Sequence, residues 1–432
     1  MTTTEAPLRT WAGNLTYSAR RLLAPTSVDE LRRLVAGSPR LRPLGTRHSF
    51  SAVADTTGDL VSVARLPRRV ELDTDARTAT VSAGLRYGEI APELHAAGFA
   101  LPNLGSLPHI SVGGASATGT HGSGDGNRVL ASSVAAVELV TASGDLLELD
   151  RSDPRFAGAV VALGRLGVVT AVTLDLVPTF EVAQQVHLDL PAAAALEHLD
   201  ALFASAYSLS LFTRWTDPWR FDVLAKHRVE HRTPAAPGPS LPQELGARPA
   251  TAPWHMLAGM PPENCTEQLG VPGPWHARLP HFKLEFTPSS GDELQTEYFV
   301  ARADAPAALA AVAGVAAVVA PVLQVSEIRS IAADDLWLSP ASGRDTVAVH
   351  FTWVGDTAAA LPAVRAVEEA LAPFAPRPHW GKVFTLPGAA VRARYPRLAD
   401  ANALAQELDP DGVFRNGFVA EYLEGADTGE GD

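Results

Sequence analysis

Two short glycine-containing segments near the N-terminus constrain the fold of this 432-residue chain more than any other feature. The first, residues 43–51, reads Pro-Leu-Gly-Thr-Arg-His-Ser-Phe-Ser, and the second, residues 105–124, mixes glycine with serine and threonine. Glycine lets backbone N–H groups approach a ligand closely, and the hydroxyl groups add neutral donors. The two segments therefore predict a cradle for a pyrophosphate group, although composition alone leaves a glycine-rich structural turn open as the alternative.

Other ligand-binding motifs do not match. The second segment lacks the order of strand, G-x-G-x-x-G run and helix that a Rossmann fold requires, and the Gly-Lys pair at 381–382 is followed by valine, unlike a P-loop. Residues 227–231 spell the H-x-x-E-H pattern of some zinc peptidases. Because the surrounding cations Lys226, Arg228 and Arg232 would repel a dication, we expect no metal site.

Length and charge set the broad class. A chain of 432 residues is too long for one hydrophobic core of ordinary size, which predicts two or three domains. Apolar residues make up 46% and charged residues 19%, as in soluble globular proteins. A net charge of −13 argues against nucleic acid or an anionic membrane as partner, because both bind basic patches. We expect a monomer.

Cysteine content and the N-terminus bear on the compartment. Cys265 is the sole cysteine, so no intramolecular disulfide can form, and a reducing compartment is the simplest interpretation. The first residues show no apolar signal segment, and we expect a cytoplasmic protein. The apolar run 307–320 is shorter than the roughly 20 residues that span a bilayer, and it predicts a buried helix.

The pattern of apolar residues divides the chain into three regions: 1–178, 179–375 and 376–432. Alternating β-rich runs, helical spacings and turn residues predict an α+β protein with one antiparallel sheet covered by helices on one face. In the first region we expect a strand pair over 70–83, a helix over 87–97, a hairpin over 134–149 and a β-rich stretch over 163–176. In the others we expect a long Pro-rich loop over 233–262, strands over 281–286, 296–301, 322–329 and 346–354, and helices over 306–320, 357–373 and 398–408.

Polar residues occupy one face of two of these strands. Glu327 and Arg329 lie two residues apart, as do His350 and Thr352, so each pair points to one side of its strand. A structural salt bridge is the plainer interpretation of the Glu327–Arg329 pair alone. Four polar side chains on one face of adjacent strands are unusual for a core, and they predict a floor for a ligand with many hydrogen-bonding groups.

The two glycine-containing segments, in this order and separation, resemble the FAD-binding domain of the vanillyl-alcohol-oxidase flavoprotein family. Motifs in all three regions resemble the members of that family that oxidise sugar alcohols, among them Trp-Ala-Gly-Asn at 11–14, Asn-Cys-Thr-Glu-Gln at 264–268, Trp-Leu-Ser-Pro at 337–340 and His-Trp-Gly-Lys at 379–382. The resemblance implies a two-domain fold. Residues 1–178 would form a PCMH-type FAD-binding domain with two α/β subdomains, 179–375 a substrate-binding cap, and 376–432 a segment that returns to the flavin.

The resemblance also implies which residues hold the cofactor. His48 would be joined covalently to the 8α-methyl group of FAD, and this would be the single link, because Cys265 lies outside the loop that supplies a second link in other members. A histidine that merely hydrogen-bonds the cofactor is the alternative. The remaining cofactor-binding residues would be Pro43, Leu44, Gly45, Thr46, Arg47, Ser49, Gly105, Ser106, Ser111, Gly113, Gly114, Thr118, Gly119, Thr120, His121, Val169 and His379.

For the substrate, the resemblance implies xylitol, sorbitol or glycerol-type alditols, oxidised at a hydroxyl-bearing carbon while O2 becomes H2O2. Ser106, Glu327, Arg329 and Thr352 would bind substrate hydroxyls. His350, Lys382 and Arg329 would be the catalytic group, with His350 helping to take the hydroxyl proton. Two alternatives remain: an aldonolactone oxidoreductase, which shares the fold, and a non-catalytic polyol-binding flavoprotein.

Gly105 departs from the pattern of the resembling members, which carry alanine there. In the family a small residue at this place controls the access of oxygen to the flavin. Glycine leaves that path more open, which favours an oxidase over a dehydrogenase.

Overall fold

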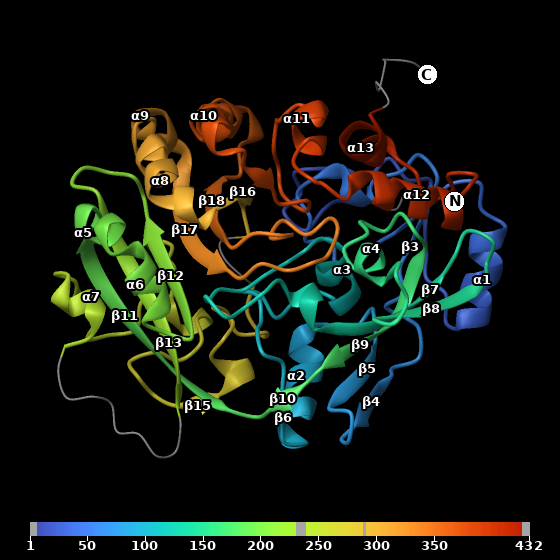
Figure 1. The fold of residues 1–432 in the computed structure, drawn as a ribbon, viewed down its shortest axis with the longest axis horizontal. Helices are drawn as coiled ribbons and strands as arrows, with labels where there is room; N and C mark the ends of the chain where they lie inside the picture. Colours follow the sequence, from blue (N-terminus) through green and yellow to red (C-terminus); the bar gives the residue numbers. More distant parts are fainter. Residues whose placement is uncertain (1–6, 230–238, 288–290, 426–432) are drawn as a thin grey trace, which may run out of the picture.

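The computed structural model describes residues 7–229, 239–287 and 291–425, and its two large sheets lie side by side (Figure 1). A five-stranded sheet and a three-stranded sheet belong to the N-terminal part, and a nine-stranded sheet belongs to the middle of the chain. The C-terminal helices lie above the N-terminal part in Figure 1, so both ends of the chain contribute to the same half.

The three-stranded sheet is parallel and sets the position of the first glycine-containing segment. Its strands are β1 (Arg21–Leu23), β3 (Asp59–Val61) and β2 (Leu41–Pro43), with helix α1 (Val28–Ala36) between β1 and β2. Ser27 caps α1 by accepting a hydrogen bond from the Glu30 N–H. Because β2 ends at Pro43, the segment 43–51 leaves the carboxyl end of a buried parallel strand, where ligands commonly bind.

The five-stranded sheet is antiparallel and confirms the expected strand pair, hairpin and β-rich stretch. Its order is β4 (Val70–Asp73), β5 (Thr78–Ser82), β9 (Val168–Asp175), β7 (Val134–Val140) and β8 (Leu146–Asp150). The predicted helix over 87–97 is α2 (Tyr87–Ala96), and the second glycine-containing segment includes the short helix α3 (Val112–Ala117). Both helices pack against the sheet through buried apolar residues.

The nine-stranded sheet is antiparallel and is formed mainly by the middle of the chain. Its elements are β11 (Glu181–Pro191), β12 (Ser208–Thr213), β13 (Arg220–Val229), β14 (Arg248–Pro249), β15 (Gly273–Pro274), β16 (Glu293–Ala301), β17 (Leu323–Ile331), β18 (Thr346–Val354) and β19 (Arg377–Pro378). The helices of this part are α5 (Ala192–Glu197), α6 (Leu199–Ala204), α7 (Leu241–Glu244), α8 (Ala305–Ala313), α9 (Ala316–Val319) and α10 (Thr357–Leu371).

The two faces of this sheet differ in polarity. Leu211, Ile328 and Val349 are register partners on neighbouring strands, and they point toward the helix-covered core. The residues on either side of each of these along its strand point to the opposite face. On β17 and β18 those residues include Glu327 and His350, so the alternation of the sequence directs polar side chains away from the helices.

The expected helix over 306–320 is divided in two. The α8 helix ends at Ala313 with Gly314 as its C-cap, and α9 begins at Ala316 and ends at Val319, two residues before Pro321. No single helix in the described residues is long and apolar enough to cross a membrane, and the bent pair 302–313 and 316–322 passes that test together, by length and composition only.

Residues 281–286 are not the strand that their alternation predicts. The N–H groups of His281 and Phe282 both point to the carbonyl oxygen of Ser106, and the pairing is limited to one bridge between Cys265 and Phe282. The segment therefore packs against the second glycine-containing segment instead of extending a sheet. Of the predicted Pro-rich loop, residues 233–238 lie outside the described residues, and the rest carries α7 and β14.

The C-terminal part returns to the N-terminal part. Its helices are α11 (Gly388–Arg392), α12 (Leu398–Leu408), where the sequence predicts it, and α13 (Gly417–Val419). The Leu41 N–H donates to the carbonyl oxygen of Val413, and Phe414 is buried against the three-stranded sheet. We propose domain boundaries at residues 178 and 375, which separate the N-terminal sheets, most of the nine-stranded sheet and this returning segment.

Arg42 ties these parts together. Its buried guanidinium donates to the carbonyl oxygens of Phe414 at 2.7 Å, Leu163 at 2.6 Å and Gly164 at 3.2 Å, and also to that of Val53. Burial lowers the pKa of Arg42 to about 9. One side chain thus supplies donors to carbonyl groups from three segments that are distant in sequence.

The substitution Arg42→Met should destabilise the fold by about 3 kcal/mol or more, because it leaves several buried carbonyl oxygens without a donor. We expect the Tm to fall by roughly 5 °C or more in differential scanning calorimetry. The exposed neighbour Arg40, changed to methionine, is the matched control. Equal Tm values for the two variants would show that Arg42 does not hold the segments together.

Candidate active site

One cavity of about 790 Å³ extends from the first glycine-containing segment to the polar face of the nine-stranded sheet. Nearly every site residue that the sequence suggests lines it, and Gly119 is the exception. Gly119 has a φ of +68°, and an added Cβ would lie 2.7 Å from the ring of Pro340, so glycine suits this position, and its contact with the cofactor stays a prediction. The lining residues are Pro43, Leu44, Gly45, Thr46, Arg47, His48, Ser49, Gly105, Ser106, Ser111, Gly113, Gly114, Thr118, Thr120, His121, Val169, Glu327, Arg329, His350, Thr352, His379 and Lys382.

The glycine-containing segments approach each other closely inside the cavity. A Cβ on Gly45 or on Gly114 would lie 2.8 Å from the Ser111 hydroxyl oxygen, closer than real Cβ contacts. Glycine at both positions therefore lets the segments meet without displacing the Ser111 hydroxyl. The Ser111 hydroxyl is buried with no hydrogen-bond partner among the described residues. A buried polar atom without a partner suits a bound ligand that supplies one.

His48 shows a second unpaired atom in the same cavity. Arg47 has a φ of +65°, which turns the chain before His48. The His48 Nδ1 lies 3.1 Å from the carbonyl oxygen of Thr46 and so carries the hydrogen, whereas Nε2 is buried and has no partner among the described residues. Burial lowers the pKa of His48 to about 4, and Trp11 stacks on the ring at 5.1 Å. A neutral, fixed imidazole facing the cavity fits attachment or contact to a flavin.

The polar floor of the cavity follows the register of three strands. Glu297 on β16 is opposite His350 on β18, which is opposite Glu327 on β17. Neighbouring strands lie about 4.8 Å apart, so these three side chains form a row across the sheet. Thr352 and Arg329 stand two residues along their strands on the same face. The four polar residues that the sequence singles out thus share one face and one cavity.

Glu297 is the centre of this floor, and sequence reasoning did not select it. Its Oε1 receives Arg329 Nη2 at 2.6 Å and lies 3.3 Å from His121 Nε2, and its Oε2 receives Lys382 Nζ at 2.7 Å. Glu297 is 1% exposed. Burial alone would raise the pKa of Glu297, but the charges of Lys382, His121 and Arg329 hold it well below its ordinary value. The carboxylate is therefore ionised near neutral pH.

Lys382 and His350 are in direct contact. Lys382 Nζ lies 2.7 Å from His350 Nδ1, and His350 Nε2 lies 3.0 Å from the Thr352 hydroxyl oxygen. Burial lowers the pKa of Lys382, and Glu297 opposes part of that effect. Burial, followed by the Lys382 charge, holds the pKa of His350 well below its ordinary value. His350 is therefore neutral, and Lys382 loses its proton more readily than a surface lysine.

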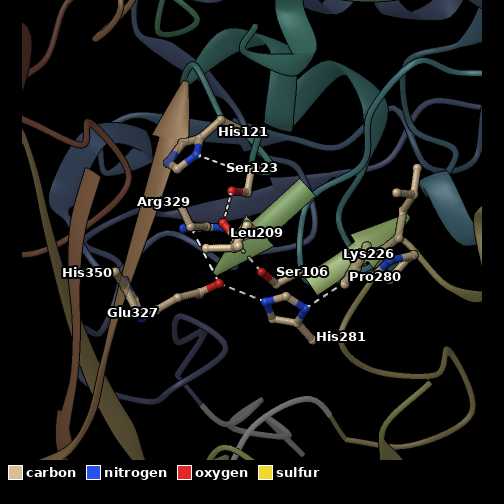
Figure 2. Close-up of polar contacts among 12 residues, drawn as sticks. Ser106, His121, Ser123, Leu209, Lys226, Pro280, His281, Glu327, Arg329 and His350 are labelled. Carbon is tan, nitrogen blue, oxygen red and sulfur yellow. Dashed lines mark hydrogen bonds and ion pairs between the residues drawn. The ribbon is translucent and has the colours of Figure 1, made fainter. Parts of the chain in front are cut away.

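Glu327 and Arg329 contact other partners more closely than each other. Arg329 Nε lies 3.7 Å from Glu327 Oε1, whereas Arg329 Nη1 lies 3.3 Å from the Ser106 hydroxyl oxygen. Glu327 Oε1 instead receives His281 Nε2 at 2.8 Å (Figure 2). His281 lines the cavity and was likewise absent from the sequence-based set.

Of Glu297 and His281, which the sequence analysis did not select, Glu297 could have been found from the sequence. Gln295 and Glu297 lie two residues apart on a strand, the same spacing as Glu327 and Arg329, and both line the cavity. Applying the same criterion, two polar residues spaced by two on one strand, to β16 would have selected Gln295 and Glu297. His281 left no comparable signal, because the alternation of residues 281–286 suggests a strand that does not form.

Metal binding finds no support in the described residues. They contain no group of three or more histidine, cysteine or acidic side chains that could hold an ion. Within the H-x-x-E-H pattern, Glu230 and His231 lie outside the described residues.

Comparison with known families and proteins shows which proteins this chain is similar to. Residues 19–150 match a family model described as an FAD-binding domain, and residues 292–424 match one described as D-arabinono-1,4-lactone oxidase. Alditol oxidase from a Streptomyces species is 53% identical over 96% of this chain and 98% of its own length. L-gulono-1,4-lactone dehydrogenase from Mycobacterium tuberculosis is 31% identical over 96% of this chain and 98% of its own length.

Solved structures show the same fold at low identity. A solvent-stable cholesterol oxidase has a TM-score of 0.77 at 17% identity and covers 96% of both chains. Xylooligosaccharide oxidase from Myceliophthora thermophila has a TM-score of 0.76 at 15% identity and covers 98% of this chain and 96% of its own. These likenesses confirm the expected α+β fold of the vanillyl-alcohol-oxidase type. The matched FAD-binding domain supports FAD as the cofactor. The chain belongs to the family of FAD-dependent oxidoreductases that includes alditol oxidase.

Proposed function

We propose that this protein oxidises a hydroxyl-bearing carbon of alditols such as xylitol, sorbitol or glycerol to the aldehyde, and reduces O2 to H2O2. The observation that carries the proposal is the row of Glu297, His350 and Glu327 in the same cavity as the glycine cradle. An alditol has many hydroxyl groups and no charge, so it needs fixed donors and acceptors. The 53% identity to an alditol oxidase supports the same substrate class.

His48 would hold FAD, whose flavin would supply the hydride acceptor for the substrate carbon and the route for the electrons to O2. Gly45, Ser111 and Gly114 would hold its pyrophosphate. Gly105 is buried, and a Cβ there would meet its nearest atoms at 3.6 Å, which is ordinary contact. An alanine would therefore fit without strain, and the glycine leaves a methyl-sized space beside the cofactor site, which favours reaction with O2.

The geometry favours Lys382 as the group that takes the hydroxyl proton. His350 has both ring nitrogens engaged, because Nδ1 accepts from Lys382 and Nε2–H donates to Thr352. A neutral Lys382 donates two N–H groups, to Glu297 and His350, and keeps its lone pair for a third direction. After protonation, the ammonium group is stabilised by Glu297. We therefore assign proton removal to Lys382 and orientation to His350, the reverse of the expectation from the sequence.

An aldonolactone oxidoreductase is the second candidate, because the model matching residues 292–424 and the 31% identical relative both carry lactone names. The compartment and assembly state extend the proposal: we propose a cytoplasmic monomer. The buried Cys265, whose thiol pKa burial raises to about 12, is compatible with such a compartment.

Xylitol should reduce the flavin faster than L-gulono-1,4-lactone. The purified protein is mixed anaerobically with each compound, and bleaching of the flavin absorbance is followed by stopped flow. We expect xylitol to bleach the flavin at a rate that saturates with concentration, and aerobic turnover to release peroxide. Preferential bleaching by the lactone would establish the second candidate, and an intact yellow protein with both would contradict alditol oxidation.

Acid denaturation tests the link to His48. The flavin colour should precipitate with the protein in trichloroacetic acid, because a covalent bond survives unfolding. In His48→Ala the colour should remain in the supernatant. A wild-type protein that releases its flavin into the supernatant would contradict the covalent link while leaving FAD binding intact.

Glu297→Gln should move the acidic limb of the pH profile for flavin reduction to lower pH. The Glu297 charge raises the pKa values of both Lys382 and His350, so its removal lowers both and keeps the base neutral in more acidic solution. A shift of about one pH unit or more is expected, since a close ion pair is worth up to ~4 kcal/mol.

The measurement is anaerobic stopped flow with xylitol across pH. Glu368→Gln is the control, because it removes a buried carboxylate that bonds Tyr298 and Thr385 on the helix side of the sheet. A midpoint that stays in place or moves to higher pH would exclude Glu297 as the controlling charge.

A further inference from the structure

A buried lysine lies behind the substrate-facing wall and takes no part in the proposed reaction. Lys226, on β13, is 1% exposed, and it is absent from the cavity lining. A buried cation costs free energy unless its donors are matched. Its partners are the carbonyl oxygen of Leu279 and the ring of His281, which Figure 2 shows between Lys226 and Glu327.

The three side chains form a directed chain of hydrogen bonds. Lys226 Nζ lies 3.0 Å from His281 Nδ1, and His281 Nε2 lies 2.8 Å from Glu327 Oε1. Burial lowers the pKa of Lys226 to about 7, and both its charged and neutral forms can donate to Nδ1. Burial, with the Lys226 charge, lowers the pKa of His281 to about 4. A neutral His281 whose Nδ1 accepts from lysine must carry its hydrogen on Nε2, which faces the carboxylate.

His281 is also fixed through its backbone and its ring. Its N–H donates to the carbonyl oxygen of Ser106 at 3.0 Å, and its carbonyl oxygen accepts from the Thr266 N–H at 2.9 Å. Its ring meets Phe212 edge-on at 5.8 Å. Because both ring nitrogens are engaged, His281 has no donor or acceptor left for a substrate, although it lines the cavity.

We propose that Lys226 and His281 are positioning residues that hold the Glu327 carboxylate in place for a substrate hydroxyl remote from the reacting carbon. The inference rests on the proposed function. Glu327 lies one strand beyond His350, whereas Lys382 contacts His350 from the side of Glu297. A polyol with its reacting hydroxyl at Lys382 would therefore reach Glu327 with a later hydroxyl. The relay thus acts on substrate affinity rather than on proton removal.

Four variants test this relay. His281→Phe removes both nitrogens, and Lys226→Met removes the donor to Nδ1 with little change of shape. His281→Gln is the conservative variant, because its amide oxygen can accept from Lys226 while its NH2 group donates to Glu327. Cys265→Ala is the control, because it alters buried packing near Lys226 but removes none of the hydrogen bonds that link Lys226, His281 and Glu327.

Anaerobic stopped flow over a range of xylitol concentrations gives two values: the maximal rate of flavin reduction and the concentration that gives half of it. For His281→Phe and Lys226→Met we expect the half-saturating concentration to rise about 10-fold to 100-fold, because a charged acceptor loses its fixed donor. The maximal rate should stay within about threefold of wild type. His281→Gln should restore the half-saturating concentration to within about threefold, and Cys265→Ala should leave both values unchanged.

Flavin retention and the Tm of every variant establish that it is folded. Unchanged half-saturation in folded His281→Phe and Lys226→Met would overturn the proposal, as would an equal fall of the maximal rate in all His281 and Lys226 variants. Failure of His281→Gln to restore affinity would overturn it too. A wild-type protein whose flavin xylitol does not reduce would instead contradict the proposed function, so the two failures are distinct.

Discussion

The buried carboxylate of Glu297 is the constraint on which the site depends, since it accepts hydrogen bonds from an arginine and a lysine, and lies beside a histidine ring, that come from separate parts of the chain. Arg329 comes from β17, Lys382 from the C-terminal segment, and His121 from the second glycine-containing segment. Removing one partner of such a desolvated set leaves the others uncompensated, at a cost of several kcal/mol. The hydrogen bonds of Arg329 and Lys382 to Glu297 therefore fix the returning tail against the nine-stranded sheet, beside the cofactor cradle.

This constraint also explains how one cavity can serve two tasks. At the end lined by Gly45, Ser111 and Gly114, the glycines have no side chain, so the backbone N–H groups are open to contact with a pyrophosphate. The end lined by Glu297 and Lys382 is shaped by polar groups that are hydrogen-bonded to each other before a substrate enters. An uncharged polyol then exchanges hydrogen bonds with water for hydrogen bonds with the floor, and no new charge is buried.

The sequence predicted the elements whose periodicity is strong, and it failed where contacts distant in the chain decide. Alternation located β17 and β18, so Glu327, Arg329, His350 and Thr352 were placed on one face correctly. The same alternation was misleading at 281–286, because the carbonyl oxygen of Ser106 takes the N–H groups that a strand would need. Likewise, the packing of Pro340 against Gly119 brings together residues far apart in the chain, and the sequence did not indicate it. The direction of each hydrogen bond at His350 depends on Lys382 and Thr352 together. Because Lys382 is 32 residues away in the chain, the sequence around His350 could not predict these directions.

The central claim is that a polyol lies across the strands, with its reacting hydroxyl at Lys382 and a later hydroxyl at Glu327. A crystal structure of the FAD-containing protein with xylitol, obtained under anaerobic conditions, tests it most directly. The account predicts a terminal hydroxyl oxygen within hydrogen-bond distance of Lys382 Nζ and a second hydroxyl within that distance of the Glu327 carboxylate. Xylitol bound in the cavity with no hydroxyl at Lys382, or with Glu327 turned away from it, would contradict the account.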